Sequence, residues 1–187
     1  AGSIALDCKR RGLVVEWKPD GTPVTSADRA VDEVLIETIG RGMPGCGFLT
    51  EESGELGPAD PRWIIDPIDG TNQLIRGLDY FWSILIALEV EGEIALAVAF
   101  NPATRDLWTA WKGNGAWRNR NQIRVSAAAS LERSLLCFNN LRSLAWNGLL
   151  PKILPLLRDR QMRDHGSGGF RGFMWVAGGE GEVCLDT

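Results

Sequence analysis

The segment Trp63–Thr71 limits the possible folds of this chain more than any other. It begins with three consecutive apolar residues, Trp63–Ile65, which predict a buried strand. Two carboxylates, Asp66 and Asp69, follow in a turn that a proline and a glycine favour. A carboxylate that leaves a core strand is costly unless a cation pairs with it. The chain therefore needs a fold in which a buried strand ends in an acidic turn.

Further acids lie close to this turn in the sequence. Glu51 and Glu52 come a short way upstream, and such a cluster of hard oxygen ligands suits Mg²⁺. If a helix begins at the Gly70–Thr71 peptide, its free N–H groups face an anion. Metal, water and phosphate would then share one small space.

An alternative remains open at the acidic turn. Asp66-Pro67 and Asp69-Gly70 are also ordinary turn pairs, and Asp-Gly is among the commonest. An isolated D-x-x-D-G-T run favours that simpler interpretation. The metal interpretation therefore depends on the rest of the chain.

Composition narrows the class of protein. The 187 residues can bury a sizeable core, and 44% apolar and 24% charged residues are ordinary for a globular chain. A net charge of −4 argues against a nucleic-acid surface, and an acidic chain that binds phosphate needs a metal bridge. The apolar runs are of strand length, so we expect no membrane partner. The four cysteines lack C-x-x-C spacing, which predicts buried or free thiols in a reducing cytoplasm.

Apolar spacing predicts helices and strands in both parts of the chain. Residues 25–41 have helical spacing with Thr25 or Ser26 as the N-cap. The other expected elements are strands at 48–50, 106–111, 161–163 and 182–185, a loop at 54–62, a hairpin of 81–89 with 94–101, and helices at 149–158 and 167–177. This pattern predicts α+β layers.

Several motifs occur together and in order. They are P-V-T-x-A-D at 23–28, E-E-[ST] at 51–53, D-P-[IL]-D-G-T at 66–71, K-G-x-G-A at 112–116, and glycine-rich segments at 166–169 and 176–182. In this combination the chain resembles the inositol monophosphatase family of metal-dependent phosphatases, over nearly its whole length.

The resemblance implies a fold and an organisation. The fold would be α+β, a layered α/β/α/β sandwich of the inositol monophosphatase and fructose-bisphosphatase type, in a single phosphatase domain over 1–187. The metal-site half would span about 1–125 and the substrate-side half about 126–187. We expect both ends to be cut, because family members continue to a W-D-x-A segment whose Asp is a further metal ligand. The resemblance also implies a homodimer.

A set of metal ligands also follows from the resemblance. Glu51, Asp66, Asp69 and the backbone carbonyl of Ile68 would hold two or more Mg²⁺ ions, with Mn²⁺ as a substitute. Acids this close cannot all ionise without a cation. Glu52 is either a ligand shifted by one position or a solvated neighbour, and motif position favours Glu51.

The catalytic residues implied by the family pattern are Glu51, Thr71 and Asp28. Glu51 and Thr71 would orient and deprotonate a metal-activated water that attacks a phosphomonoester in line. Asp28 would hydrogen-bond Thr71, and it is equally a first-turn acid that faces a helix dipole. The D-x-x-D-G-T spacing differs from the D-x-D-x-T of aspartyl-phosphate enzymes, so we expect no covalent phosphoenzyme.

The substrate would contact both halves of the chain. The substrate-binding residues that the resemblance implies are Asp69, Gly70, Thr71, Gly166, Ser167, Gly168 and Asp186. Asp186 would bind a hydroxyl or amino group of the substrate, or it is simply a solvent-facing strand end.

Two substrates fit this pattern, histidinol phosphate and inositol monophosphate. Arg76-Gly77, the segment 163–169 and a possible pairing of Asp186 with an ammonium group favour histidinol phosphate. Nucleotide and sugar bisphosphates rank lower. A non-catalytic metal- or phosphate-binding protein on the same fold stays an alternative, because Asn72-Gln73-Leu74 departs from the usual family sequence.

Overall fold

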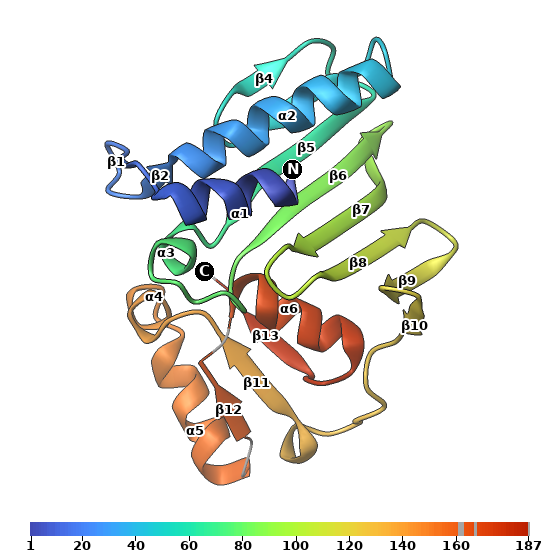
Figure 1. The fold of residues 1–187 in the computed structure, drawn as a ribbon. Coiled ribbons are helices and arrows are strands. Elements are labelled where there is room, and N and C mark those ends of the chain that lie inside the picture. The colour runs from blue at the N-terminus through green and yellow to red at the C-terminus, as the bar shows by residue number, and fades with distance from the viewer. Residues whose placement is uncertain (161–162, 167, 187) are drawn as a thin grey trace. The chain divides into compact units, whose positions relative to one another are not determined.

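The computed structural model describes residues 1–160, 163–166 and 168–186, and the chain divides into two compact units, Ala1–Asn121 and Gln122–Thr187. Each unit has its own sheet and its own hydrophobic core (Figure 1). This mixture of helices and strands confirms the predicted α+β class. Across the described ranges, no helix combines the length and the apolar character needed to cross a membrane.

A long mixed sheet forms the centre of the first unit. In spatial order its strands are β10 (Asn121–Ile123), β9 (Gly115–Arg118), β8 (Asp106–Trp111), β7 (Glu93–Asn101), β6 (Ser83–Val90), β5 (Arg62–Asp69), β3 (Gly47–Thr50) and β4 (Gly54–Leu56). β3 and β5 are parallel, and β5 to β9 form an antiparallel meander. The predicted hairpin is therefore confirmed as β6 and β7.

The predicted loop at 54–62 is wrong at its start. Strand β4 pairs antiparallel with β3 there, with Thr50 opposite Gly54. All three residues of β4 are exposed, so the strand exists through backbone pairing alone. No apolar alternation marks it in the sequence.

Helices α1 (Gly2–Arg11) and α2 (Ser26–Gly42) lie together on one face of the sheet (Figure 1). Helix α1 packs beside α2, and α2 contacts β5. A short ribbon of β1 (Val15–Trp17) and β2 (Pro23–Thr25) precedes α2. Their core is buried and apolar, and it comprises Ala5, Ala27, Val31, Ile68, Leu74, Trp82 and Ile84.

Helix α2 begins where its sequence predicts. Thr25 is the N-cap, and its hydroxyl accepts a hydrogen bond from the Ala27 N–H at 3.1 Å. The Asp28 side chain accepts in return from the Thr25 N–H at 2.8 Å. This reciprocal capping box satisfies backbone donors that a helix start leaves free.

Strand β5 runs further than the sequence indicates. It continues through both carboxylates to Asp69, and its pairing with β6 changes register between Asp66 and Asp69. Pro67 lies inside this irregularity, and a proline cannot donate a ladder hydrogen bond. The acidic turn is thus a bulged strand end rather than a free turn.

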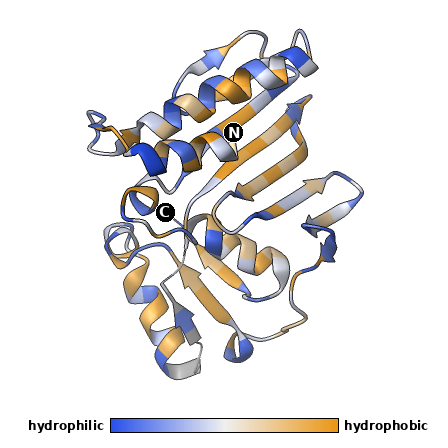
Figure 2. Ribbon diagram, in the orientation of Figure 1, coloured by the Kyte–Doolittle hydropathy of each residue, from blue (hydrophilic) through white to orange (hydrophobic). Residues whose placement is uncertain are grey.

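The second unit is built on a parallel sheet. Its strands, in the order β12 (Arg163–His165), β11 (Leu135–Phe138) and β13 (Val183–Leu185), are accompanied by η1 (Leu131–Arg133), α4 (Leu141–Trp146), α5 (Leu150–Arg160) and α6 (Gly169–Gly178). Leu136, Leu144 and Ile153 form its core. Figure 2 shows the apolar character of β11 and of β6 and β7 in the first unit. Gln161 and Met162, predicted to begin a strand, lie outside the described residues.

Candidate active site

The acidic segments meet because β3 and β5 are parallel neighbours. Thr50 pairs with Ile65, and the Glu51 N–H donates to the Ile65 carbonyl at 3.1 Å. The carboxyl ends of parallel strands lie at the same edge of a sheet. Glu51 and Asp66 therefore leave adjacent strands side by side, which places the E-E-S and D-P-I-D-G-T motifs together.

Asp66 is the most perturbed acid of this cluster. Burial is the largest cause that raises the pKa of Asp66, and together with the negative charges of Asp69 and Glu51 and a hydrogen bond to Glu51 it brings this pKa to about 8. Its Oδ1 atom is buried and has no hydrogen-bond partner among the described residues. A buried, unpartnered carboxylate oxygen beside two other acids needs either a proton or a cation.

Lys18 is a member of the cluster that the sequence did not reveal. It follows β1, and its Nζ atom lies 2.9 Å from Glu51 Oε1 and 2.8 Å from Glu52 Oε1. Burial lowers the pKa of Lys18, but the hydrogen bonds to Glu52 and Glu51 outweigh this and raise it above its ordinary value. In a sequence, a lysine in a polar turn looks the same as a solvated one.

The two glutamates differ in exposure. The Glu52 side chain is 11% exposed and the Glu51 side chain 47% exposed. Glu51 hydrogen-bonds Asp66, and both this bond and its negative charge raise the pKa of Asp66. The geometry thus favours Glu51 over Glu52 as the glutamate that acts together with Asp66.

The turn from β5 into α3 (Thr71–Ile75) requires its glycine. Gly70 has φ +91°, and a Cβ atom there would stand 2.5 Å from the Phe81 carbonyl oxygen. Only glycine tolerates both this backbone conformation and this approach. The helix expected after Gly70 begins at Thr71.

Thr71 and Asp28 are in direct contact, as the sequence predicts. Thr71 Oγ1 lies 3.0 Å from Asp28 Oδ1 and 3.1 Å from the Ile68 carbonyl oxygen. Asp28 is 1% exposed, and burial raises its pKa against the opposing hydrogen bonds from Thr25 and Thr71. A hydroxyl has one hydrogen, so Thr71 donates to one acceptor at a time and keeps lone pairs to accept from another group.

These residues fit a divalent cation chemically. Carboxylate oxygens from Glu51, Asp66 and Asp69, with the Ile68 carbonyl nearby, are the hard donors that Mg²⁺ prefers. Within the described ranges, no three acidic, histidine or cysteine side chains already converge as a finished metal cluster. Lys18 contacts Oε1 of Glu51, so a cation would meet Glu51 either through its other oxygen or in place of Lys18.

The remaining predicted residues belong to the second unit. Gly168 is the N-cap of α6, and a Cβ atom there would lie 2.0 Å from the Asn139 backbone nitrogen. Asp186 is exposed, and its Oδ1 accepts a hydrogen bond from Asn139 Nδ2 at 2.9 Å. Gly166 is exposed, whereas Ser167 lies outside the described residues. Gly168 and Asp186 thus share a neighbour, Asn139, that the sequence did not single out.

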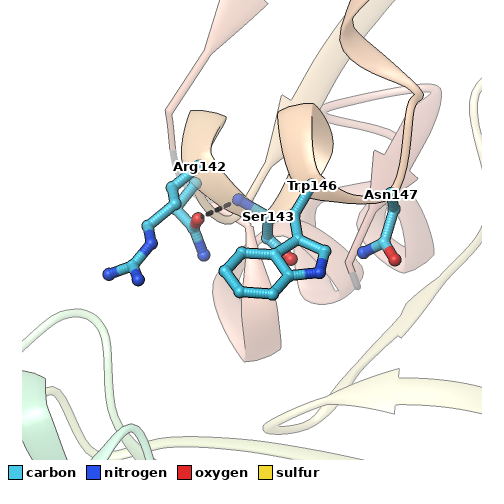
Figure 3. A pocket seen from close by; sticks show the side chains of 5 residues that line it. Arg142, Ser143, Trp146 and Asn147 are labelled. Carbon is cyan, nitrogen blue, oxygen red and sulfur yellow. Dashed lines mark hydrogen bonds between the residues drawn. The ribbon is translucent and has the colours of Figure 1, made fainter.

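A pocket opens beside α4 in the second unit (Figure 3), and the residues that line it are Asn140, Arg142, Ser143, Trp146 and Asn147. The Arg142 guanidinium lies 5.9 Å from the centre of the Trp146 ring, and Trp146 is 80% exposed. The Asn140 side chain accepts from the Ser143 N–H at 2.6 Å and caps the helix. None of these five residues is a predicted substrate ligand.

Comparison with known proteins gives matches over most of the chain. A family model described as the inositol monophosphatase family matches residues 1–187. A histidinol-phosphatase of Mycobacterium tuberculosis is 37% identical over 180 residues, 93% of this chain and 68% of that protein. A histidinol-phosphatase of Chlorobaculum parvum is 38% identical over 188 residues, 100% of this chain and 72% of that protein.

A further relative and a solved structure extend this similarity. An inositol-1-monophosphatase of Rhizobium meliloti is 40% identical over 128 residues, 67% of this chain and 48% of that protein. The structure of the extragenic suppressor protein suhB from Bartonella henselae aligns with a TM-score of 0.85 and 29% identity, covering 96% of this chain and 71% of that one.

Proposed function

Because the chain belongs to the inositol monophosphatase family, it is a phosphatase, and we propose that it hydrolyses a small phosphomonoester with Mg²⁺ held at the β3–β5 edge. The resemblance seen in the sequence motifs and the fold type that it implied are both confirmed. The proposal concerns three points: the identity of the cation, the roles of single residues, and the substrate.

The observation that carries the proposal is the state of Asp66. A carboxyl with a pKa of about 8 and a buried, unpartnered oxygen is unfavourable in a protein without a cation. We assign Glu51, Asp66, Asp69 and the Ile68 carbonyl as the groups that hold Mg²⁺. When bound, the ion supplies positive charge and makes a water molecule more acidic.

Thr71 and Asp28 position the attacking water in this proposal. With its proton donated to Asp28 or to the Ile68 carbonyl, the Thr71 oxygen accepts a hydrogen from water. Glu51 takes a proton from the same water. Water attacks phosphorus, the ester bond breaks, and the proton that Glu51 took from the water passes to the leaving oxygen, so that the alcohol and phosphate are released.

Phosphate binding would use the start of α3. The first turn of a helix has N–H groups without intrahelical partners, and Gly70 lets the backbone approach a ligand closely. Asp69, Gly70 and Thr71 are therefore proposed as the phosphate side of the site, and no covalent phosphoenzyme is needed.

Histidinol phosphate is the proposed substrate. Two relatives that match at least 93% of this chain are named histidinol-phosphatases. Asp186 is exposed and fixed by Asn139, so it is available to pair with an ammonium group. Inositol monophosphate is the second candidate, because the Rhizobium meliloti relative at 40% identity carries that name.

The test is phosphate release from a panel of histidinol phosphate, inositol monophosphate and a sugar bisphosphate, with Mg²⁺ or with EDTA. We expect Mg²⁺-dependent turnover that is fastest on histidinol phosphate. Asp69→Asn should lose turnover, and Glu55→Gln on exposed β4 should not. Equal turnover in EDTA would refute the metal assignment, and a faster reaction on another ester would refute the substrate.

A further inference from the structure

Helix α2 carries a second buried carboxylate that the proposed mechanism does not use. Asp32 is 1% exposed, as is Asp28. The two lie four residues apart, so their side chains project from the same face of the helix. This face points toward the sheet that carries the acidic cluster, since α2 packs against β5.

Asp32 forms hydrogen bonds to both ends of the turn that follows β3. Its Oδ2 atom accepts hydrogen bonds from Ser53 Oγ at 2.5 Å and from Thr50 Oγ1 at 3.2 Å. Thr50 Oγ1 in turn accepts from the Ser53 N–H at 2.8 Å. These hydrogen bonds fix Thr50 and Ser53, which flank Glu51 and Glu52 in the turn.

Asp28 anchors the second acidic segment, residues 66–71, through one hydrogen bond. It accepts a hydrogen bond from Thr71, the residue that follows the D-P-I-D-G turn. Four residues of helix separate the two carboxylates by only about 6 Å along the axis. One rigid turn of α2 thus anchors both segments of the candidate metal site.

The burial of Asp32 calls for a reason. Its Oδ1 atom is buried and has no hydrogen-bond partner among the described residues. A buried carboxylate with an unpartnered oxygen is costly, so its place in the fold has to be justified by the contacts that its other oxygen makes. The two hydrogen bonds at Oδ2 hold Thr50 and Ser53, so the evident use of Asp32 is to fix the turn that carries Glu51.

We propose that Asp32 is a positioning residue, which fixes the Thr50–Ser53 turn and thereby presents the Glu51 carboxylate to the cation. This rests on the proposed function for the identity of the site. Asp32 contacts neither cation nor substrate. Its loss weakens cation binding and leaves the substrate contacts in place.

The test compares Mg²⁺ binding by calorimetry in the purified wild-type protein, Asp32→Asn and Glu33→Gln. Glu33 is the matched control because it is the next acid on α2 and is exposed. We expect Asp32→Asn to bind Mg²⁺ about tenfold more weakly, the effect typical of a residue that orients a metal ligand. Excess Mg²⁺ should restore much of the turnover, with an unchanged KM for the phosphate ester. Glu33→Gln should match the wild-type protein.

A second variant provides the same test if Asp32→Asn does not fold. Ser53→Ala removes one donor to Asp32 and should weaken Mg²⁺ binding in the same direction, with a smaller change. Wild-type Mg²⁺ affinity in either folded variant, even with a lowered Tm, would overturn the proposal, as would a wild-type protein that binds no Mg²⁺. A wild-type protein that binds Mg²⁺ but releases no phosphate would instead overturn the proposed function alone.

Discussion

Replacing Asp66 by Asn should stabilise the metal-free protein, and the gain should grow with pH. Burial and the neighbouring acids raise the pKa of Asp66 to about 8, whereas an aspartate in an unfolded chain has a pKa of about 3.9. Between these values the folded protein keeps a proton that the unfolded chain has lost. The free energy of unfolding therefore falls as pH rises through this window and levels off above about pH 8.

The size of the effect follows from the pKa difference. Each pH unit in the window removes about 1.4 kcal/mol, so Asp66 alone could remove up to about 6 kcal/mol between about pH 4 and pH 8. Asp66 is only partly buried, and its charge is shared with Asp69 and Glu51. Solvent screening at such a site reduces the expected loss to about 2–3 kcal/mol.

The assay is urea unfolding in EDTA at about pH 5, 7 and 9. Relative to the wild-type protein, Asp66→Asn should gain about 2–3 kcal/mol over this range, while Glu55→Gln on exposed β4 should follow the wild type. Added Mg²⁺ should reverse the order at about pH 8, because only the wild type offers the full ligand charge. Parallel pH profiles of the wild type and Asp66→Asn in EDTA would refute the reasoning.

Three further predictions concern the turn after β5 and the substrate side. Thr71→Ala should lower kcat by about 100-fold with little change in KM, because the hydroxyl acts mainly in the transition state; steady-state kinetics that show only a higher KM would contradict this. Asp186→Asn should cost about tenfold more in kcat/KM for histidinol phosphate than for inositol monophosphate, since only an ammonium group gains a charge-assisted hydrogen bond; equal losses would leave Asp186 a strand-end residue held by Asn139. Gly70→Ala should destabilise the fold by about 2–3 kcal/mol in chemical denaturation, because φ is +91° and the new methyl group would meet the Phe81 carbonyl at 2.5 Å; an unchanged midpoint would count against this turn geometry.

Local chemistry explains what the sequence predicted well. The start of α2 depends on Thr25 and Asp28, which contact each other within one helical turn. The Thr71–Asp28 contact spans 43 residues, yet it was expected because both residues belong to motifs of one family. The order of the motifs therefore predicted a contact between residues far apart in the sequence, which secondary-structure propensity alone could not predict.

What the sequence missed depends on contacts between distant segments. Lys18 reaches Glu51 across 33 residues, and Ser53 reaches Asp32 across 21 residues. Neither pair belongs to a short local pattern, so nothing in composition or periodicity marks it. Strand β4 was missed for a related reason, since its three exposed residues pair only through the backbone of β3.

The central claim is that the β3–β5 edge holds a divalent cation. The most direct measurement is a crystal structure of the protein soaked with Mn²⁺ and inorganic phosphate, with anomalous scattering recorded at the manganese edge. The account predicts an anomalous peak about 2.0–2.3 Å from the carboxylates of Asp66 and Asp69, with an oxygen of Glu51 facing the ion, either beside its contact with Lys18 or in place of it. An ordered cluster with no anomalous peak would contradict it.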